Sequence, residues 1–508
     1  MFKLTTAIPL HTTLVAAGLL IYVLATRARQ QRRHPYAAIA WVLGIAAFPY
    51  LGLPIYLVFG TRKIVRPATR SQPVPAGPWS ALAPAWSTRL LAALGTAEAR
   101  PQAAVRLHAD GPHALQELRD LLASAHHTLD ICTYVLSNDQ TGTELAGRLA
   151  ERARAGVRVR LLVDGVGSVR GGRSHDAVLQ AAGVEVQRFM PALQRPGRGR
   201  ANLRNHRKLV VADGLRLWAG GRNLADEYFI GQGGQPAWVD LSFTAHGALA
   251  TQAMALFEGD WRLAAGRVRH PRTSYAERAR RYDLLLRNRA LGEGDRQALR
   301  STAAQTEQDV AAAQPASPLA PDEDFSIARA ISLAQWVPSG PDFHEDILHA
   351  LLVSAAFHAE QCLMLVTPYF VPDEGLTEAL LLAAKRGVRV TLVLPARSNH
   401  RLADWARGRS VRLLASNGVD VRLVPGMLHA KAVVMDDVLA LCGSANLDGR
   451  SLFINYEAMA AFYGHAEIEW LTRWIGQQAA RGQPASAAPP GLARDILEGL
   501  IATVAFQL

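Results

Sequence analysis

Two residue types are scarce in this chain of 508 residues, and each scarcity narrows what the protein can be. There are only three cysteines, Cys132, Cys362 and Cys442, and each lies in or beside an apolar run. This small, odd number argues against a disulfide framework and a cysteine-based metal cluster, and buried thiols of this kind suit a reducing compartment. Lysine is also rare, with five lysines against fifty arginines. Where such an arginine-rich chain keeps a lysine, a specific role for the compact ammonium is expected.

Two of the five lysines occur in the same short motif, which appears once in each half of the chain. Both copies read H-x-K-x4-D, and an asparagine follows fifteen residues after each lysine. The first copy comprises His206, Lys208, Asp213 and Asn223, and the second comprises His429, Lys431, Asp436 and Asn446. Composition alone does not explain this agreement, so the duplicated motif indicates chemistry rather than packing.

The residues around the motifs predict an α/β fold built from two related halves. The apolar runs 209–212 and 432–435 have strand length, and we expect a turn at each aspartate and a return strand that ends at Gly-x-x-Asn. Upstream, strand-like runs alternate with helix-length segments in both halves, which favours a mainly parallel sheet. Each half holds few site residues by itself, so we expect the two halves to share one site.

Four segments carry a resemblance to a known family. Residues 202–208, 338–341, 367–373 and 443–451 resemble the phospholipase D superfamily, and in particular the bacterial cardiolipin synthases. The resemblance covers roughly residues 100–261 and 336–508, together with the N-terminal membrane hairpin described below. It implies two pseudo-symmetric α/β lobes with both histidines facing one phosphate, and phosphatidyl transfer without a metal or other cofactor. The stretch between Trp261 and Trp336 is longer than the family leads us to expect.

Two histidines suit the cleavage of a phosphodiester. A neutral imidazole attacks phosphorus to give a phosphohistidine, and a protonated one donates to the leaving oxygen and later deprotonates the incoming hydroxyl. The residues alone do not separate these roles. The more usual order in the family makes His206 the nucleophile and His429 the acid/base.

Other candidate site residues supply charge and hydrogen bonds. Lys208 and Lys431 provide positive charge for the phosphate, and Asn223, Asn446 and the Ser444 hydroxyl are expected to donate hydrogen bonds to its oxygens.

Three acids complete the candidate set. Asp213 and Asp436 are expected to hold a histidine or the strand turn rather than to touch substrate. Glu457 matches a family position that orients a catalytic histidine, and an ordinary acid at a strand end is an equal alternative.

The N-terminus predicts a membrane hairpin, because residues 7–25 and 36–60 contain no charged residue. A cleaved signal peptide is the rival interpretation of the first segment. Basic residues are nearly balanced on the two sides, so orientation stays open. The hairpin predicts a multi-pass protein of the bacterial inner (cytoplasmic) membrane, and the cysteines favour a cytoplasmic catalytic region.

Composition divides the chain into six segments. They are a membrane hairpin (1–70), a linker (71–102), a first lobe (103–261), a basic helical insert with a flexible linker (262–324), a second lobe (325–480) and a C-terminal tail (481–508). Within the tail, residues 492–508 predict an amphipathic helix that docks on the lobes or on lipid.

These features predict a cardiolipin synthase that uses phosphatidylglycerol as both donor and acceptor and releases glycerol. The net charge of +12 suits phosphatidylglycerol and other anionic membrane lipids as partners. The alternatives are a hydrolytic phospholipase D that gives phosphatidic acid, a phospholipase D-like nuclease and a non-enzymatic scaffold. The chain shows no recognisable nucleic-acid motif, so nucleic acid is not expected as a partner, and the sequence does not indicate an oligomeric state.

Overall fold

The computed structural model describes residues 2–28, 35–60, 63, 83–167, 174–191, 202–266, 274–288 and 332–504. The first lobe contains β1 (Arg100–His108), α5 (Gly111–Ala123), β2 (Thr128–Thr133), α6 (Gln140–Arg154), β3 (Arg158–Asp164), α8 (Asp176–Ala181), β4 (Glu185–Phe189), β5 (Leu209–Ala212), β6 (Arg216–Gly220), α9 (Asp226–Phe229), β7 (Ser242–Gly247) and α10 (Ala248–Ala264). The second lobe contains β8 (Leu333–Ser339), α14 (Ile347–His358), β9 (Cys362–Val366), β10 (Phe370–Val371), α15 (Glu374–Lys385), β11 (Arg389–Pro395), α16 (Arg401–Ala406), α17 (Gly408–Ser416), β12 (Asp420–Val424), β13 (Ala432–Met435), β14 (Leu439–Gly443), β15 (Leu447–Asp448), α18 (Gly449–Phe453), β16 (Glu457–Phe462) and α19 (His465–Arg481). Outside the lobes lie α1 (Phe2–Ala28), α2 (Pro35–Ala47), α3 (Pro49–Phe59), α4 (Ala85–Ala93), α11 (Tyr275–Asn288), β17 (Gln483–Pro484) and α20 (Leu492–Val504).

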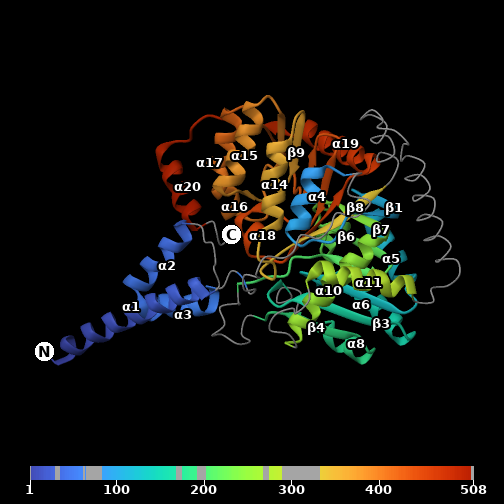
Figure 1. Ribbon diagram of the computed structural model, residues 1–508, viewed down its shortest axis with the longest axis horizontal. Coiled ribbons are helices and arrows are strands. Elements are labelled where there is room, and N and C mark those ends of the chain that lie inside the picture. Colours follow the sequence, from blue (N-terminus) through green and yellow to red (C-terminus); the bar gives the residue numbers. More distant parts are fainter. Residues whose placement is uncertain are drawn as a thin grey trace.

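One sheet of 15 strands runs through both lobes, in the order β17-β12-β11-β9-β13-β14-β16-β8-β1-β7-β6-β5-β2-β3-β4. Outward from the central pair β8 and β1, which lie side by side in Figure 1, each lobe adds equivalent strands in the same order. The two halves expected from the duplicated motif are therefore related by a pseudo-two-fold axis between β8 and β1.

The sheet is mainly antiparallel, so the expectation of a mainly parallel sheet is wrong. Of the fourteen junctions between neighbouring strands in this sheet, four are parallel and ten are antiparallel. The parallel junctions lie within β2-β3-β4 and β9-β11-β12, where helices cross between strands. The motif strands instead form tight hairpins, β5-β6 and β13-β14, and a tight turn can join only antiparallel strands.

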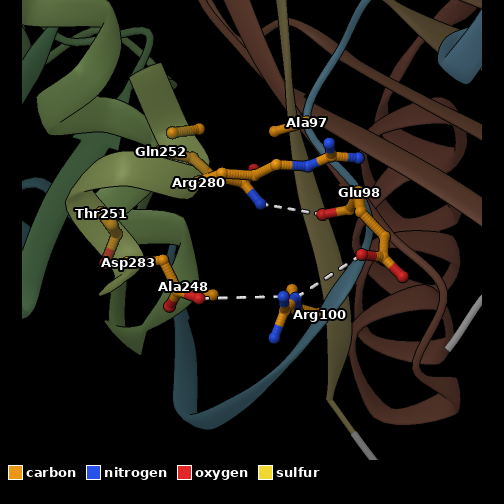
Figure 2. Close-up of a pocket in the computed structure, with 9 residues that line it drawn as sticks. Ala97, Glu98, Arg100, Ala248, Thr251, Gln252, Arg280 and Asp283 are labelled. Carbon is orange, nitrogen blue, oxygen red and sulfur yellow. Dashed lines mark hydrogen bonds and ion pairs between the residues drawn. The ribbon is translucent and has the colours of Figure 1, made fainter. Parts of the chain in front are cut away.

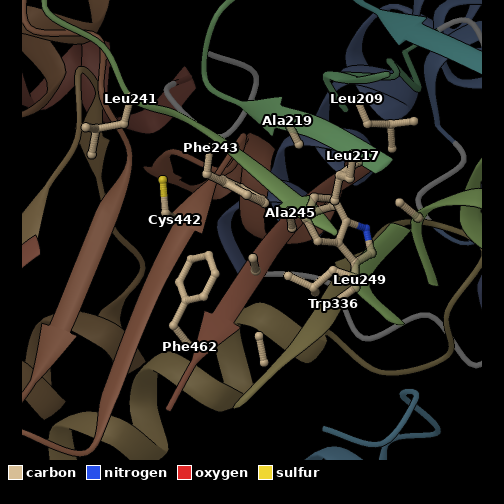
Figure 3. Close-up of a cluster of buried hydrophobic side chains, with 14 of the residues drawn as sticks. Leu209, Leu217, Ala219, Leu241, Phe243, Ala245, Leu249, Trp336, Cys442 and Phe462 are labelled. Atoms are coloured by element: carbon tan, nitrogen blue, oxygen red, sulfur yellow. The ribbon is translucent and has the colours of Figure 1, made fainter. Parts of the chain in front are cut away.

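An apolar core holds the two lobes together where they meet. Backbone pairing joins β1 to β8, and the ring of Phe243 lies 5.9 Å from that of Trp336 and 5.4 Å from that of Phe462. These three side chains come from β7, β8 and β16, and Figure 3 shows them packed within one cluster. Shared burial of this kind fixes the lobes relative to each other.

A polar contact reinforces the same junction. Gln252 in α10 donates to the Glu98 carbonyl (2.8 Å) and accepts from the Trp336 amide (2.7 Å). Beside it lies a cavity of about 30 Å³, with Arg100 at 3.7 Å from Asp283 on its wall (Figure 2). This volume holds water but is too small for a lipid head group, so the pocket is no candidate for the substrate site.

The N-terminal helices differ from the expected pair of spans. The uncharged segment 36–60 forms two helices, because Phe48 precedes Pro49 and adopts a non-helical backbone (φ −135°, ψ 64°). Tyr22, Ile45 and Tyr56 pack together between the three helices, which project away from the lobes (Figure 1). Within the described residues, none of the helices has both the length and the apolar character needed to cross a membrane.

A third lysine ties the end of this N-terminal region to the second lobe. Lys63 is 7% exposed and lies 2.9 Å from a carboxylate oxygen of Asp346. Its ammonium also donates to the Gly340 carbonyl at 3.2 Å.

Among the connecting segments, the linker holds more regular structure than composition suggests, while helices lie where they were expected in the insert and the C-terminal tail. The expected linker 71–102 contains α4 and the start of β1, while residues 71–82 lie outside the described part. The expected insert 262–324 includes α11, which packs on α10, and residues 289–331 are not described. In the C-terminal tail, α20 docks on the second lobe, where Glu498 lies 2.6 Å from Arg412 in α17.

Candidate active site

Each motif histidine lies just before a strand of its own lobe and is held by the backbone of the other lobe. The His206 amide donates to the Tyr456 carbonyl (2.9 Å), and the His429 amide donates to the Val239 carbonyl (2.7 Å). Each histidine segment also forms an isolated parallel bridge across the lobe boundary. Both histidines are therefore positioned by contacts between the lobes.

A buried carboxylate from the opposite lobe contacts Nδ1 of each histidine. Asp240, just before β7, places Oδ2 2.7 Å from Nδ1 of His429. Glu457, at the start of β16, places Oε1 3.3 Å from Nδ1 of His206. A carboxylate at Nδ1 holds the proton there and leaves Nε2 for chemistry. Of the two alternatives for Glu457, the orienting role agrees with this geometry.

Asp240 is a site residue that sequence reasoning missed. Gly220 pairs with Ser242, and Gly443 pairs with Met459, so Asp240 and Glu457 occupy equivalent positions two residues before these partners. The sequence did contain a signal for this residue, because Glu457 is an acid that follows the second Gly-x-x-Asn. Looking for its counterpart in the first half would have identified Asp240.

Both carboxylates are ionised at neutral pH despite complete burial. Burial raises the pKa of Asp240, but Lys431 and His429 outweigh it and lower the pKa to about 2. The pKa of Glu457 is also lowered, because His206 and Lys208 outweigh the effect of burial. Each carboxylate can therefore stabilise an imidazolium that forms during reaction.

Burial lowers the pKa values of the two histidines and the two lysines. Burial lowers the pKa of His206, and burial together with Lys431 lowers the pKa of His429 to about 4. Lys208 of the first lobe also lowers the pKa of His429, so the two motifs lie close together. Burial likewise lowers the pKa of Lys208, and that of Lys431 to about 7. As neutral imidazoles, both histidines are competent nucleophiles.

The lysine ammonium groups lie beside the histidines, as expected. The Lys208 ammonium lies on the backbone of His206, where it donates to the carbonyl at 2.6 Å. The Lys431 ammonium contacts both ring nitrogens of His429, at 2.6 Å from Nδ1 and 3.0 Å from Nε2. Positive charge thus lies beside each histidine, where charge on a phosphate needs to be compensated.

Aromatic rings that were not among the candidate site residues pack against both histidines. The Tyr134 ring centroid lies 4.3 Å from that of His206, and the Tyr228 centroid lies 5.1 Å from that of His429. Tyr369 lies further from His429, at 6.4 Å. Tyr134 and Tyr369 end the apolar runs upstream of the motifs, but the contacts that bring them to the site are tertiary.

The hydroxyl of Ser444, expected to donate to phosphate, contacts a carboxylate in the structure, and its role toward phosphate stays a prediction. The hydroxyl donates to Oε2 of Glu457 at 2.6 Å and so positions the carboxylate behind His206. The equivalent residue in the first lobe is Gly221, where an added Cβ would lie 2.2 Å from Oδ1 of Asp240. The shorter first-lobe acid therefore takes the space that the serine side chain fills in the second lobe.

The two asparagines lie at the ends of the return strands and are buried. Nδ2 of Asn223 donates to the Tyr228 hydroxyl at 2.8 Å, and the side chain of Asn446 hydrogen-bonds Asp448. An amide carries two N–H donors, and the contact described for each asparagine engages one of the two.

The motif aspartates hold strand turns, which is the second of the two roles expected for them. Asp213 accepts from the amides of His126, His127 and Thr128 at 2.7–2.9 Å. Asp436 accepts from the corresponding three amides at the start of β9, also at 2.7–2.9 Å. Both residues have positive φ (53° and 48°), so they close the hairpin and tie it to the neighbouring strand.

Arg207, the middle residue of the first motif, joins the lobes beneath the site. It is fully buried and lies 2.5 Å from Asp260, and it donates to the carbonyls of Glu457 (3.1 Å) and Ser339 (2.9 Å). The equivalent residue in the second motif is Ala430. This network fixes the backbone of the acid behind His206.

Known protein families and structures match this chain in both lobes. The family described as "Cardiolipin synthase, PLD-like domain" matches residues 118–261 and 352–478, and "Phospholipase_D-nuclease N-terminal" matches residues 15–60. Cardiolipin synthase A of Citrobacter koseri is 29% identical over 483 residues, which cover 89% of each chain. Cardiolipin synthase 1 of Bacillus cereus is 26% identical and covers 91% of this chain and 85% of its own length. The crystal structure of phosphatidylserine synthase from Haemophilus influenzae shares the fold, with a TM-score of 0.58 at 14% identity over 83% of this chain and all of that one.

Proposed function

The chain belongs to the cardiolipin synthase family of phospholipase D-like proteins, and we propose that it joins two phosphatidylglycerol molecules into cardiolipin and releases glycerol. The observation that carries this proposal is the pair of imidazoles, each backed by a buried carboxylate from the opposite lobe. Such a pair supplies a nucleophile and a general acid to one phosphodiester.

In the first half-reaction, Nε2 of His206 attacks the phosphorus of one phosphatidylglycerol. The N–P bond forms as the P–O bond to the glycerol head group breaks, and His429 donates its Nε2 proton to the leaving oxygen. Glu457 stabilises the charge that develops on His206, and Asp240 stabilises the imidazolium of His429.

The proposed roles need a neutral His206 and a protonated His429, and these protonation states are favoured once an anionic phosphodiester is bound. Burial and the neighbouring ammonium groups lower the pKa of both histidines, which suits a neutral nucleophile. A phosphodiester carries negative charge, which raises the pKa of an adjacent histidine. Substrate therefore helps to protonate the histidine that faces the leaving oxygen.

In the second half-reaction, the free hydroxyl of another phosphatidylglycerol replaces the departed glycerol. His429, now neutral, takes its proton as the new O–P bond forms and the N–P bond to His206 breaks. Lys208 and Lys431 lie where they would compensate charge on the phosphate oxygens in both steps. The side-chain amides of Asn223 and Asn446 would add hydrogen bonds.

We also propose that the chain associates with the bacterial inner membrane through α1, α2 and α3, with a cytoplasmic catalytic region. The match over residues 15–60 and the exposed apolar side chains of these helices, such as Leu20, Leu43 and Leu51, support this location. A lipid substrate requires such proximity.

Product analysis tests the proposed reaction. Purified full-length protein in phosphatidylglycerol vesicles should give cardiolipin and glycerol in equal amounts, measured by mass spectrometry. Phosphatidic acid in place of cardiolipin would make the protein a hydrolytic phospholipase, and no lipid product would refute the proposal.

The histidine variants test the mechanism. His206→Ala and His429→Ala should each lose turnover while keeping the thermal unfolding midpoint of the parent. His349→Ala is a matched control, because His349 pairs with Asp373 at 3.0 Å outside the site. It should retain full activity.

A further inference from the structure

The C-terminal helix α20 buries one acid against the second lobe and exposes several apolar side chains. Glu498 is 1% exposed and lies 2.6 Å from Arg412, while Asp495 forms a half-exposed pair with Arg409 at 2.9 Å. On the other side of the helix, Leu492 is 78% exposed and Ile496 is 53% exposed. A helix on a water-facing surface has the reverse arrangement. The outward side of α20 therefore suits contact with an apolar phase.

The helix α16 continues this apolar surface. Leu402 is 53% exposed and Trp405 is 38% exposed, and the guanidinium of Arg494 in α20 lies 5.7 Å from the Trp405 ring centroid. We call the exposed side chains of the two helices the α16–α20 patch. The patch consists of Leu402, Trp405, Leu492, Ile496 and Leu497.

The charges around the patch favour an anionic surface. Arg397 and Arg401 are exposed beside it, and neither side chain makes a hydrogen bond or ion pair with any residue that the structure describes. The nearby acids are neutralised instead, because Asp404, Asp495 and Glu498 each pair with an arginine. Leucine and tryptophan flanked by arginine are typical of segments that lie in the interface of anionic bilayers.

The patch adjoins the candidate active site. The Tyr369 hydroxyl donates to Asn399 (2.5 Å), and its ring lies 5.6 Å from that of His400, the residue before α16. The same ring lies 6.4 Å from that of His429. One side chain thus separates the start of α16 from a catalytic histidine.

We propose that the α16–α20 patch inserts into the head-group region of an anionic phospholipid bilayer and delivers the substrate phosphodiester to the site. This rests on the proposed function, because it assumes that the substrate is a membrane lipid. The surface of a second copy of this chain is the rival occupant. The position beside the site and the unpaired arginines favour lipid.

The test replaces three exposed side chains and compares two physical forms of one substrate. The variant Trp405→Ala/Ile496→Ser/Leu497→Ser is made in the full-length chain. Its matched control is Leu284→Ser/Leu285→Ser on α11, where the leucines are 59% and 49% exposed. Rates are measured on long-chain phosphatidylglycerol vesicles and on monomeric short-chain phosphatidylglycerol.

The patch variant should lose at least tenfold in rate on vesicles and keep its rate on monomeric lipid, and the control should keep both. Unchanged rates on both substrates, or equal losses on both, would overturn the proposal. A change from dimer to monomer by light scattering in the patch variant would also overturn it and identify a second copy as the occupant.

A second measurement does not depend on turnover. Hydrogen–deuterium exchange of α20 in the parent chain should be slower in phosphatidylglycerol vesicles than in phosphatidylcholine vesicles, and the patch variant should lose this difference. Equal exchange in both vesicles would refute the docking. If exchange differs while neither substrate reacts, the docking stands and the proposed function fails.

Discussion

Asp240→Asn is the change that most directly tests the carboxylate behind each histidine. The amide has the same shape as the carboxylate, but it no longer holds a proton on Nδ1 of His429, which lies 2.7 Å away. In the serine protease triad, the same replacement lowers kcat by about 10⁴-fold because the imidazole takes the wrong tautomer. We expect a loss of kcat between about 10³-fold and 10⁴-fold here.

The same replacement has a separate cost in stability. The pKa of Asp240 is lowered from 3.8 to about 2, which corresponds to about 2 kcal/mol of stabilisation of the folded state. Because the folded pKa lies below the unfolded value, this stabilisation is present above about pH 4 and is lost as the pH falls through about 2. The variant should therefore lose about 2 kcal/mol at neutral pH.

Steady-state kinetics and denaturant unfolding measure the two effects separately. Asp213→Asn is the matched control, because Asp213 accepts three backbone amides in the same lobe and touches neither histidine. It should lose stability while keeping turnover at temperatures where it is folded. The assignment of Asp240 is refuted if Asp240→Asn keeps more than a third of the parent kcat. It is also refuted if Asp213→Asn loses as much kcat as Asp240→Asn does.

Three further predictions follow from the geometry. Asp436→Ala should lower stability by about 1–3 kcal/mol, measured by urea unfolding, because three backbone amides lose their acceptor, and turnover of the folded protein should persist. Arg207→Met should cost about 3–5 kcal/mol, because Asp260 is left as a buried unpaired charge, and adding Asp260→Leu should recover part of the loss. The pKa of Lys431 is lowered to about 7, so kcat/KM should fall as the pH rises above 7, when its positive charge is lost. Lys431→Arg should remove this alkaline fall in a pH–rate profile, whatever its effect on the maximum.

Local regularities account for what could be predicted correctly. The turn at each motif aspartate and the return strand ending at Gly-x-x-Asn depend on neighbouring residues, and the structure confirms both hairpins. The duplicated pattern also led to two related lobes. The sheet direction was misjudged because apolar runs look alike in parallel and antiparallel strands.

The roles of polar side chains were harder to predict than their identity. Ser444 was expected to bind phosphate, but its hydroxyl faces Glu457. Tyr134 was not among the candidate site residues, although its ring packs on His206. A side chain's type limits the bonds it makes, whereas its direction depends on residues from other segments.

The sequence by itself determined the chemistry, because two histidines and two lysines in the same spacing are recognisable along the chain. Only the tertiary structure decided which acid serves which histidine. Asp240 lies 189 residues before His429 in the chain, and Glu457 belongs to the lobe opposite His206. These partners meet because β1 and β8 join the lobes into one sheet and bring the two histidine segments across its centre. Contacts over such separations leave no periodic pattern in the sequence, since they are fixed by how the two halves pack.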